Sequence, residues 1–168
     1  MTIIIRNEQP GDEQVIHDLT VKAFEPMPYS NGSEAPIIAG LRQDGDLAVS
    51  LVAVEGVDIV GHIAFSPVTI RGAGAGAGWY GLGPVSVWPH RQKQGIGSAL
   101  VKKGLSILRD RGAQGCVLVG DPNYYERFGF RCDGTLAYQE LPSAYIQSLP
   151  FGDAAASGEL KFSPAFER

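Results

Sequence analysis

The sequence is poor in the residues that disulfide frameworks, metal sites and polyanion-binding surfaces require. Its 168 residues include only two cysteines, Cys116 and Cys132, and three histidines, without the paired spacing of a zinc site. Lysine and arginine number 14 against 18 acidic residues, for a formal net charge of -4. Nucleic-acid surfaces need concentrated basic side chains. We therefore expect no metal, no free nucleic acid as partner, and a reduced, cytoplasmic setting.

Long hydrophobic runs are also missing. The stretch from Met1 to Arg6 lacks the charged lead and long apolar core of a secretory signal, and no segment approaches the length of a membrane span. With 44% hydrophobic and 19% charged residues, the chain has the composition of a globular protein, and its length suits one domain. We predict a single domain over residues 1–168 and no membrane partner.

The order of the apolar patterns predicts an α/β (α+β) fold. Helical spacing of apolar residues predicts helices at 13–24, 34–41, 96–110 and just before Gly129. β-branched and aromatic runs predict strands at 2–6, in a hairpin around the turn 55–58, and at 79–87, 115–120, 135–142 and 158–166. A strand, a crossover helix and a buried strand follow one another at 79–120, which indicates a parallel pair.

The stretch GAGAGAG, Gly72 to Gly78, contains a formal match to the dinucleotide-binding fingerprint at Gly72, Gly74 and Ala77. That fingerprint works where the turn opens a helix whose N-terminus faces the pyrophosphate. Residues 79–87 follow here and favour a strand. We interpret the stretch as a hairpin connection.

A second glycine turn, Gly95-Ile96-Gly97, opens the predicted helix 96–110 and is a candidate anion site. The first turn of a helix has backbone N–H groups without partners and a partial positive charge, and glycine lets a diphosphate approach them. Arg91 and Lys93 are candidates for an outlying phosphate. A helix start that needs glycine only for packing is the alternative.

The strand before this turn gives the anion a possible tail. Pro89 cannot donate to a strand ladder, so pairing stops there. A chain attached to the diphosphate would then run back along the strand beside Val85 and Val87, using their backbone groups.

These residues carry a family resemblance. The segment from Val85 to Gly97 resembles motif A of the GNAT superfamily of N-acetyltransferases, whose pattern is Gln or Arg, two residues, Gly, one residue, then Gly or Ala. NYYERFGF, Asn123 to Phe130, is similar to motif B, in which a tyrosine four positions before Gly-Phe lies beside the cofactor sulfur; that tyrosine is Tyr125. GHIAFSPV and GDPNYYERFGF further resemble the YhbS-like branch.

The resemblance implies a central mixed, mostly antiparallel sheet of about seven strands, with strands 4 and 5 parallel and splayed and with helices on both faces. It implies acetyl-CoA as cofactor and CoA as product. The implied cofactor-binding residues are Val85, Ser86, Val87, Arg91, Gln92, Lys93, Gln94, Gly95, Ile96, Gly97, Ser98 and Tyr125.

The implied reaction is direct attack of an amine on the thioester, with Tyr125 as general acid toward the leaving sulfur. His62 is a candidate base because its usual pKa suits the task, although a lone strand histidine is typical of a structural residue. Glu25 is a second candidate because the loop between the first two helices usually borders the acceptor in this family, and Asp121 is a third. His17 is expected on a helix surface and His90 in a turn near the cofactor.

The acceptor is expected to be an amine of a small molecule or of a peptide or protein. Two alternatives stay open: a non-catalytic CoA-binding module, and an acyltransferase with another donor, such as a longer acyl-CoA or aminoacyl-tRNA. The closing strands of this family often pair between subunits, so a homodimer is possible.

Overall fold

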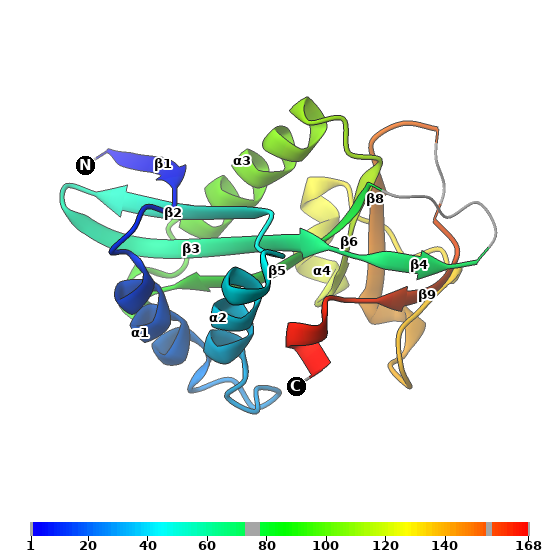
Figure 1. The fold of residues 1–168 in the computed structure, drawn as a ribbon, viewed down its shortest axis with the longest axis horizontal. Coiled ribbons are helices and arrows are strands. Elements are labelled where there is room, and N and C mark those ends of the chain that lie inside the picture. The colour runs from blue at the N-terminus through cyan, green and yellow to red at the C-terminus, as the bar shows by residue number, and fades with distance from the viewer. Residues whose placement is uncertain (1, 73–77, 154–155, 168) are drawn as a thin grey trace. The chain divides into compact units, whose positions relative to one another are not determined.

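The computed structural model describes residues 2–72, 78–153 and 156–167. The chain forms two compact units, one of residues 1–65, 83–104 and 164–168, the other of residues 66–82 and 105–163. Three elements, β3, β5 and α3, continue from one unit into the other (Figure 1). The single domain expected over 1–168 stays a prediction. Residues 73–77 of the GAGAGAG stretch, with most of its fingerprint match, lie outside the described residues.

The first unit contains a sheet of neighbouring strands in the order β1, β2, β3 and β5. Their bounds are Ile3–Asn7, Val49–Glu55, Asp58–Pro67 and Trp79–Val87. β1, β2 and β3 pair antiparallel, and the β2–β3 turn at Glu55 and Asp58 confirms the predicted hairpin. At the end of β5 the Trp88 N–H donates to the Val60 carbonyl oxygen at 3.2 Å.

One face of this sheet packs against α1 (Glu13–Phe24) and α2 (Glu34–Asp44). The shared core consists of apolar side chains from both helices and from two strands: Ile16, Leu19, Ile38, Val52, Ile59 and Ala64. The bounds of α1 match the prediction. α2 continues past the predicted Leu41 and ends before Gly45, which has a left-handed backbone with φ of 76°.

The opposite face packs against the start of α3 (Ile96–Asp110) (Figure 1). Two glycines make this contact close. A Cβ at Gly61 would lie 3.0 Å from Ile96 Cγ2, and a Cβ at Gly104 would lie 2.1 Å from the Phe65 ring. The helix therefore lies close to the sheet at Gly104.

In the second unit β6 (Gly115–Val119) lies between β5 and β8 (Ile146–Pro150). β6 is parallel to β5, over the three register pairs from Trp79↔Gly115 to Gly81↔Val117, and antiparallel to β8. The predicted parallel pair is therefore confirmed. The short helix α4 (Pro122–Tyr125) follows β6.

A small second sheet in this unit has the strand order β4, β9 and β7. The bounds are Thr69–Arg71, Gly158–Lys161 and Leu136–Ala137. The described residues thus hold nine strands where about seven were expected. The additional two are β4 and β8, and the predicted strand 135–142 is reduced to the two residues of β7. The mixed, mostly antiparallel character is confirmed.

Candidate active site

The glycine turn lies in the first unit, between β5 and α3. A single 3-10 turn at Pro89–Arg91 follows the strand, and then Lys93 and Gly95 both adopt left-handed backbone conformations, with φ of 65° and 83°. The first hydrogen bond of α3 runs from Ala99 N–H to Gly95 O at 3.0 Å. The N–H groups of Ile96, Gly97 and Ser98 therefore precede the helical ladder, as an anion-binding helix start requires. Successive backbone N–H groups in a turn of this kind form the concave backbone that anions favour.

The side chains of Gln92 and Arg91 hold this turn through three contacts. The Gln92 amide Nε2 donates to the Val87 carbonyl oxygen at 3.1 Å and ties the turn to the end of β5. Arg91 donates from both terminal nitrogens to Glu55, at 3.0 and 2.9 Å, and from Nε to Gln94 Oε1 at 3.1 Å. These side chains are engaged within the protein, whereas Lys93 is exposed.

Along β5 the side chains alternate between the two faces of the sheet. Ser86 is buried, with 1% exposure, and its hydroxyl donates to Thr20 of α1 at 3.4 Å. The Ser86 side chain is therefore not available to a ligand. Val85 and Val87 point to the other face and are half-buried.

Tyr125 lies in the second unit, at the end of α4. The side chain of Asp121 caps this helix by accepting from Asn123 N–H at 2.9 Å, and Gly129, with φ of 100°, ends the turn that follows. The Tyr125 ring packs edge-on against Tyr124 and Phe130, with centroids 4.9 and 6.1 Å apart. A Cβ on Gly120 would lie 2.8 Å from this ring, so the glycine at the end of β6 makes room for it.

His62 lies on β3, on the sheet face that α1 and α2 cover, and is fully buried. Its Nε2 is 2.8 Å from the Ser50 hydroxyl, which donates to Glu8 Oε1 at 2.8 Å, and Glu8 accepts a bidentate pair from Arg42 at 2.8 and 2.9 Å. Burial lowers the pKa of His62 from 6.5 to about 4. The surroundings favour a neutral structural histidine over the base predicted from the sequence.

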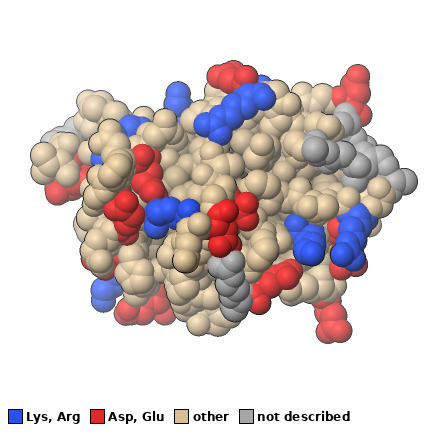
Figure 2. Space-filling model, in the orientation of Figure 1, with Lys and Arg blue, Asp and Glu red and all other residues tan. Residues whose placement is uncertain are grey.

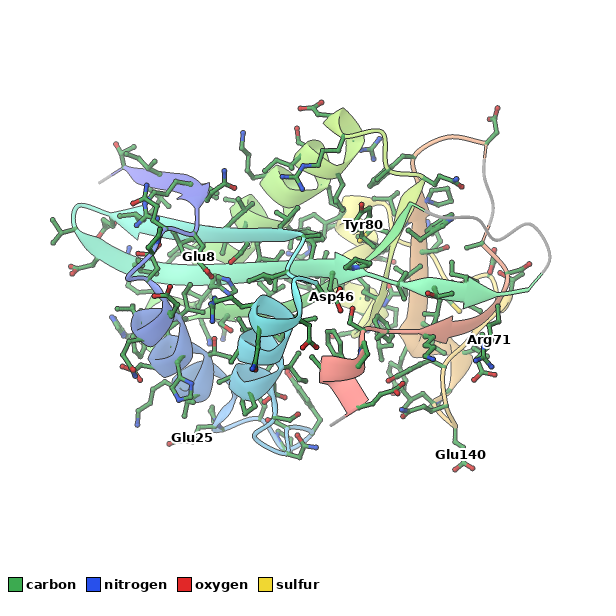
Figure 3. All side chains as sticks on the ribbon, viewed as in Figure 1. Glu8, Glu25, Asp46, Arg71, Tyr80 and Glu140 are labelled. Carbon is green, nitrogen blue, oxygen red and sulfur yellow. The ribbon has the colours of Figure 1, made fainter. Side chains whose placement is uncertain are left out.

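The remaining sequence candidates are at the surface. Glu25 follows the last residue of α1 (Figure 3), with 63% of its side chain exposed and Lys22 Nζ at 3.7 Å. Asp121 serves as the cap of α4. His90 is exposed in the turn after β5, and its ring centroid is 6.4 Å from that of Trp88. His17 lies on the exposed side of α1, as expected.

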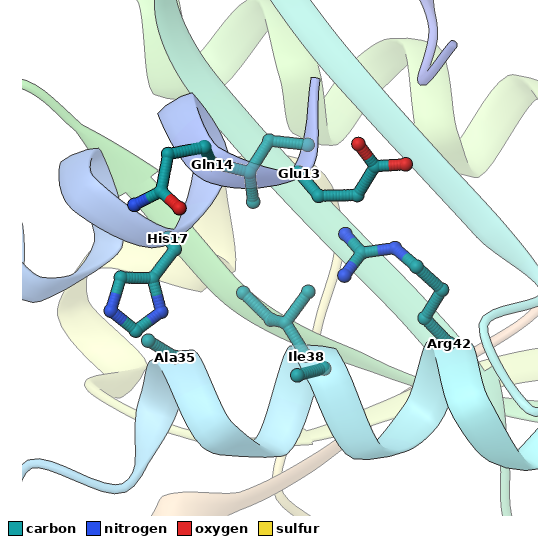
Figure 4. Close-up of a pocket in the computed structure, with 8 residues that line it drawn as sticks. Glu13, Gln14, His17, Ala35, Ile38 and Arg42 are labelled. Atoms are coloured by element: carbon teal, nitrogen blue, oxygen red, sulfur yellow. The ribbon is translucent and has the colours of Figure 1, made fainter. Parts of the chain in front are cut away.

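A groove of about 270 Å³ opens between α1 and α2 (Figure 4). His17 and Arg42 face it from the two helices, and Ile16 and Ile38 contribute apolar surface. None of the predicted cofactor-binding or catalytic residues is among those that line it.

Three further features of the described residues concern surface charge, metal-binding groups and membrane-spanning helices. On the face drawn in Figure 2 acidic and basic side chains are interspersed. Among the described residues there is no group of three or more His, Cys, Asp or Glu side chains that would hold a metal ion. Within the same residues, no helix combines the length and hydropathy that crossing a bilayer requires.

The open turn between β5 and α3, with its left-handed Lys93 and Gly95, is a candidate site for a phosphate-bearing ligand. The family model described as "Acetyltransferase (GNAT) domain" matches residues 5–132. The chain belongs to the GNAT family of acetyltransferases.

Individual relatives show which branch of the family this chain resembles. The chain is 36% identical over 129 residues, 76% of its length, to the "Uncharacterized N-acetyltransferase YhbS" of Escherichia coli (strain K12), of which the match covers 73%. Among solved structures, a GNAT acetyltransferase from Brucella melitensis in complex with acetyl-CoA is 47% identical, with a TM-score of 0.86 and 98% of each chain covered. Escherichia coli YhbS in complex with CoA is 30% identical, with a TM-score of 0.88 over 99% of this chain and 92% of that one. The YhbS-like resemblance of the sequence is confirmed.

Sequence reasoning missed the partners of these residues. Glu55, which binds Arg91, was assigned only to the hairpin turn, and the Glu8, Arg42 and Ser50 chain beside His62 was not foreseen. These contacts join residues 12 to 42 positions apart, and ordinary surface acids and hydroxyls give no local signal of such a pairing.

Proposed function

We propose that this protein transfers the acetyl group of acetyl-CoA to an amine of a small molecule or of a peptide or protein. The observation that carries the proposal is the turn Gln92 to Ser98, with its left-handed Lys93 and Gly95 and its N–H groups ahead of the helical ladder. Membership of the GNAT family and the two relatives that were crystallised with acetyl-CoA and CoA support it.

In this proposal the backbone does the binding. The N–H groups from Lys93 to Ser98 hold the pyrophosphate, whereas the Gln92 N–H, also predicted to bind it, donates to the Pro89 carbonyl oxygen at 3.4 Å. The backbone groups of Val85 and Val87 pair with the pantetheine arm and polarise the thioester carbonyl. The side chains of Gln92 and Arg91 keep the turn in shape. The Ser86 side chain, predicted to bind the cofactor, takes no part, because its hydroxyl is buried against Thr20.

Acetyl-CoA supplies a thioester, which the acceptor amine opens by forming a C–N bond while the C–S bond breaks. Tyr125 donates its phenolic proton to the departing sulfur and recovers a proton from solvent. The motif match carries this assignment, and the fixed aromatic surroundings of Tyr125 support it because they restrict the ring.

Loss of the ammonium proton needs another route than His62. A base must reach the substrate, and His62 is fully buried with its Nε2 engaged by Ser50. We assign His62 to the support of the sheet and retain Glu25, at the start of the loop between α1 and α2, as the candidate that acts directly or through a water. Asp121 caps α4. The acceptor, a homodimer and a cytoplasmic location stay predictions.

The test is release of free CoA thiol from acetyl-CoA in the presence of a panel of amines and peptide N-termini. We expect thiol release with at least one acceptor and thermal stabilisation by acetyl-CoA and CoA. Stabilisation without thiol release would favour a non-catalytic CoA-binding module, and stabilisation only by longer acyl-CoAs would identify another donor. No stabilisation by any of these ligands would refute the proposal.

A further inference from the structure

Glu55, the last residue of β2, has its carboxylate bonded to Arg91 of the turn before α3. Its side chain is 15% exposed and that of Arg91 is 20% exposed. Both carboxylate oxygens accept from Arg91, at 3.0 and 2.9 Å, across 36 positions of sequence. Two parallel charge-assisted bonds fix orientation as well as distance. The bond from Arg91 also lowers the pKa of the Glu55 carboxyl below its usual value, which keeps it ionised.

Arg91 transmits this constraint to Gln94. A guanidinium only donates, so the Gln94 amide must turn its oxygen toward Arg91 Nε, which lies 3.1 Å away. The amide NH2 of Gln94 then faces away from Arg91. Lys93 lies between these two residues and holds a left-handed backbone, with φ of 65°. The Glu55–Arg91–Gln94 contacts therefore span the one non-glycine left-handed residue of the turn.

We propose that Glu55 is a positioning residue for acetyl-CoA binding. It holds Arg91, and through Arg91 the Arg91–Gln94 segment, in the conformation that presents the backbone N–H groups to the pyrophosphate. Arg91 in turn acts through the loop and does not bind the outlying 3′-phosphate of the cofactor. The inference rests on the proposed function, because it concerns the same cofactor site.

The competing arrangement is that Arg91 leaves Glu55 and binds the 3′-phosphate. The two arrangements differ in their response to that phosphate. If the pair positions the loop, its loss raises the Kd for acetyl-CoA and for 3′-dephospho-acetyl-CoA by the same factor. If Arg91 binds the 3′-phosphate, its loss raises only the Kd for acetyl-CoA. They also differ in the effect of removing Glu55, since this would release Arg91 for phosphate binding.

The experiment measures the Kd, KM and kcat of the full chain with both ligands for wild type, Glu55→Gln, Arg91→Gln and the double variant. We expect each single variant to raise Kd and KM for both ligands by the same factor, roughly three- to tenfold, with kcat within twofold of wild type. The double variant should lose no more affinity than either single variant, because both substitutions remove the same interaction. Arg91→Lys should resemble Arg91→Gln, since lysine lacks the fork that reaches Glu55 and Gln94 together.

Asp58→Asn is the matched control. Asp58 is exposed, is the register partner of Glu55 in the same hairpin, and loses the same charge. It should leave Kd for both ligands unchanged. Glu55→Asp, which keeps the carboxylate, should recover most of the affinity. If Glu55→Gln fails to fold, Arg91→Gln removes the same pair from its other side and carries the comparison of the two ligands.

Three results would overturn the inference. One is that Arg91→Gln weakens the affinity for acetyl-CoA but not for its dephospho form, while Glu55→Gln leaves the affinity for acetyl-CoA unchanged or makes it higher. Another is an equal loss in Asp58→Asn, and the third is unchanged affinity in both single variants. If wild type itself binds neither ligand, the proposed function has failed and the inference falls with it.

Discussion

Replacing Gly104 by alanine tests how closely α3 lies on the sheet. The new Cβ would lie 2.1 Å from Phe65 Cε1 and 2.4 Å from Cζ. Since carbon atoms pack at about 3.5 Å or more, the helix or the ring must move by roughly 1.4 Å. Such overpacking costs up to about 3 kcal/mol, and alanine returns about 1 kcal/mol of helix propensity. We expect a net loss of about 2 kcal/mol of unfolding free energy.

Urea denaturation followed by tryptophan fluorescence measures this loss, and the melting temperature should fall by about 4 to 8 °C for a chain of this size. Lys103→Ala is the control, because it introduces the same residue one position away on the exposed side of α3, and it should stay within about 0.5 kcal/mol of wild type. The double variant Phe65→Leu/Gly104→Ala should lose less unfolding free energy than the two single variants lose in total. A Gly104→Ala protein as stable as wild type would refute the close contact.

Three further predictions concern the site and its support. Tyr125→Phe should lower kcat by about 100-fold or more, while Tyr124→Phe should not; unchanged turnover across pH would exclude Tyr125 as the acid. Because burial lowers the pKa of His62 from 6.5 to about 4, the unfolded chain binds a proton in this window that the folded chain does not. Stability should therefore fall as pH drops from 6.5, by up to about 1.4 kcal/mol per pH unit. His62→Asn should flatten this slope between pH 6.5 and 5, and an unaltered slope would contradict the assignment. Lys93→Val should raise the KM for acetyl-CoA several-fold, because a β-branched residue resists a φ of 65°, whereas Lys93→Gly should keep it within twofold; equal effects would mean that the lysine side chain binds the cofactor.

The sequence predicted best those elements that have both a clear period and a local stop signal. α1 begins after Gly11-Asp12 and ends before Pro26, and its predicted and observed bounds agree. The turn at Glu55 and the parallel strand β6 are similar cases, since turn residues and a continuous apolar run are local features.

β8 was missed because its burial does not follow its hydrophobicity. Gln147 and Ser148 are buried polar residues within a five-residue strand. Their burial is possible because Gln147 Nε2 donates to Gly120 O at 3.0 Å and the Ser148 backbone bonds with Arg131. Partners that lie 17 to 27 residues away leave no mark in the local pattern.

In the candidate site, too, some features could be predicted from the local sequence and others could not. The turn around Gly95 could be predicted because helix starts and glycine conformations are local properties. The buried position of His62 and the engagement of Arg91 by Glu55 could not, because each depends on which strands become neighbours. A strand histidine gives the same sequence pattern whether it faces a substrate or a helix.

The chain Arg42, Glu8, Ser50 and His62 has a consequence for how this sequence can diverge. Replacing one member alone leaves a charge or a hydroxyl without its counterpart, and such losses are costly where the remaining group is buried. An apolar substitute of similar volume for all four together carries no such penalty. Descendants of this protein should therefore keep or discard the four residues as a set, and the halfway sequences between those two end points should be the least stable ones in the lineage.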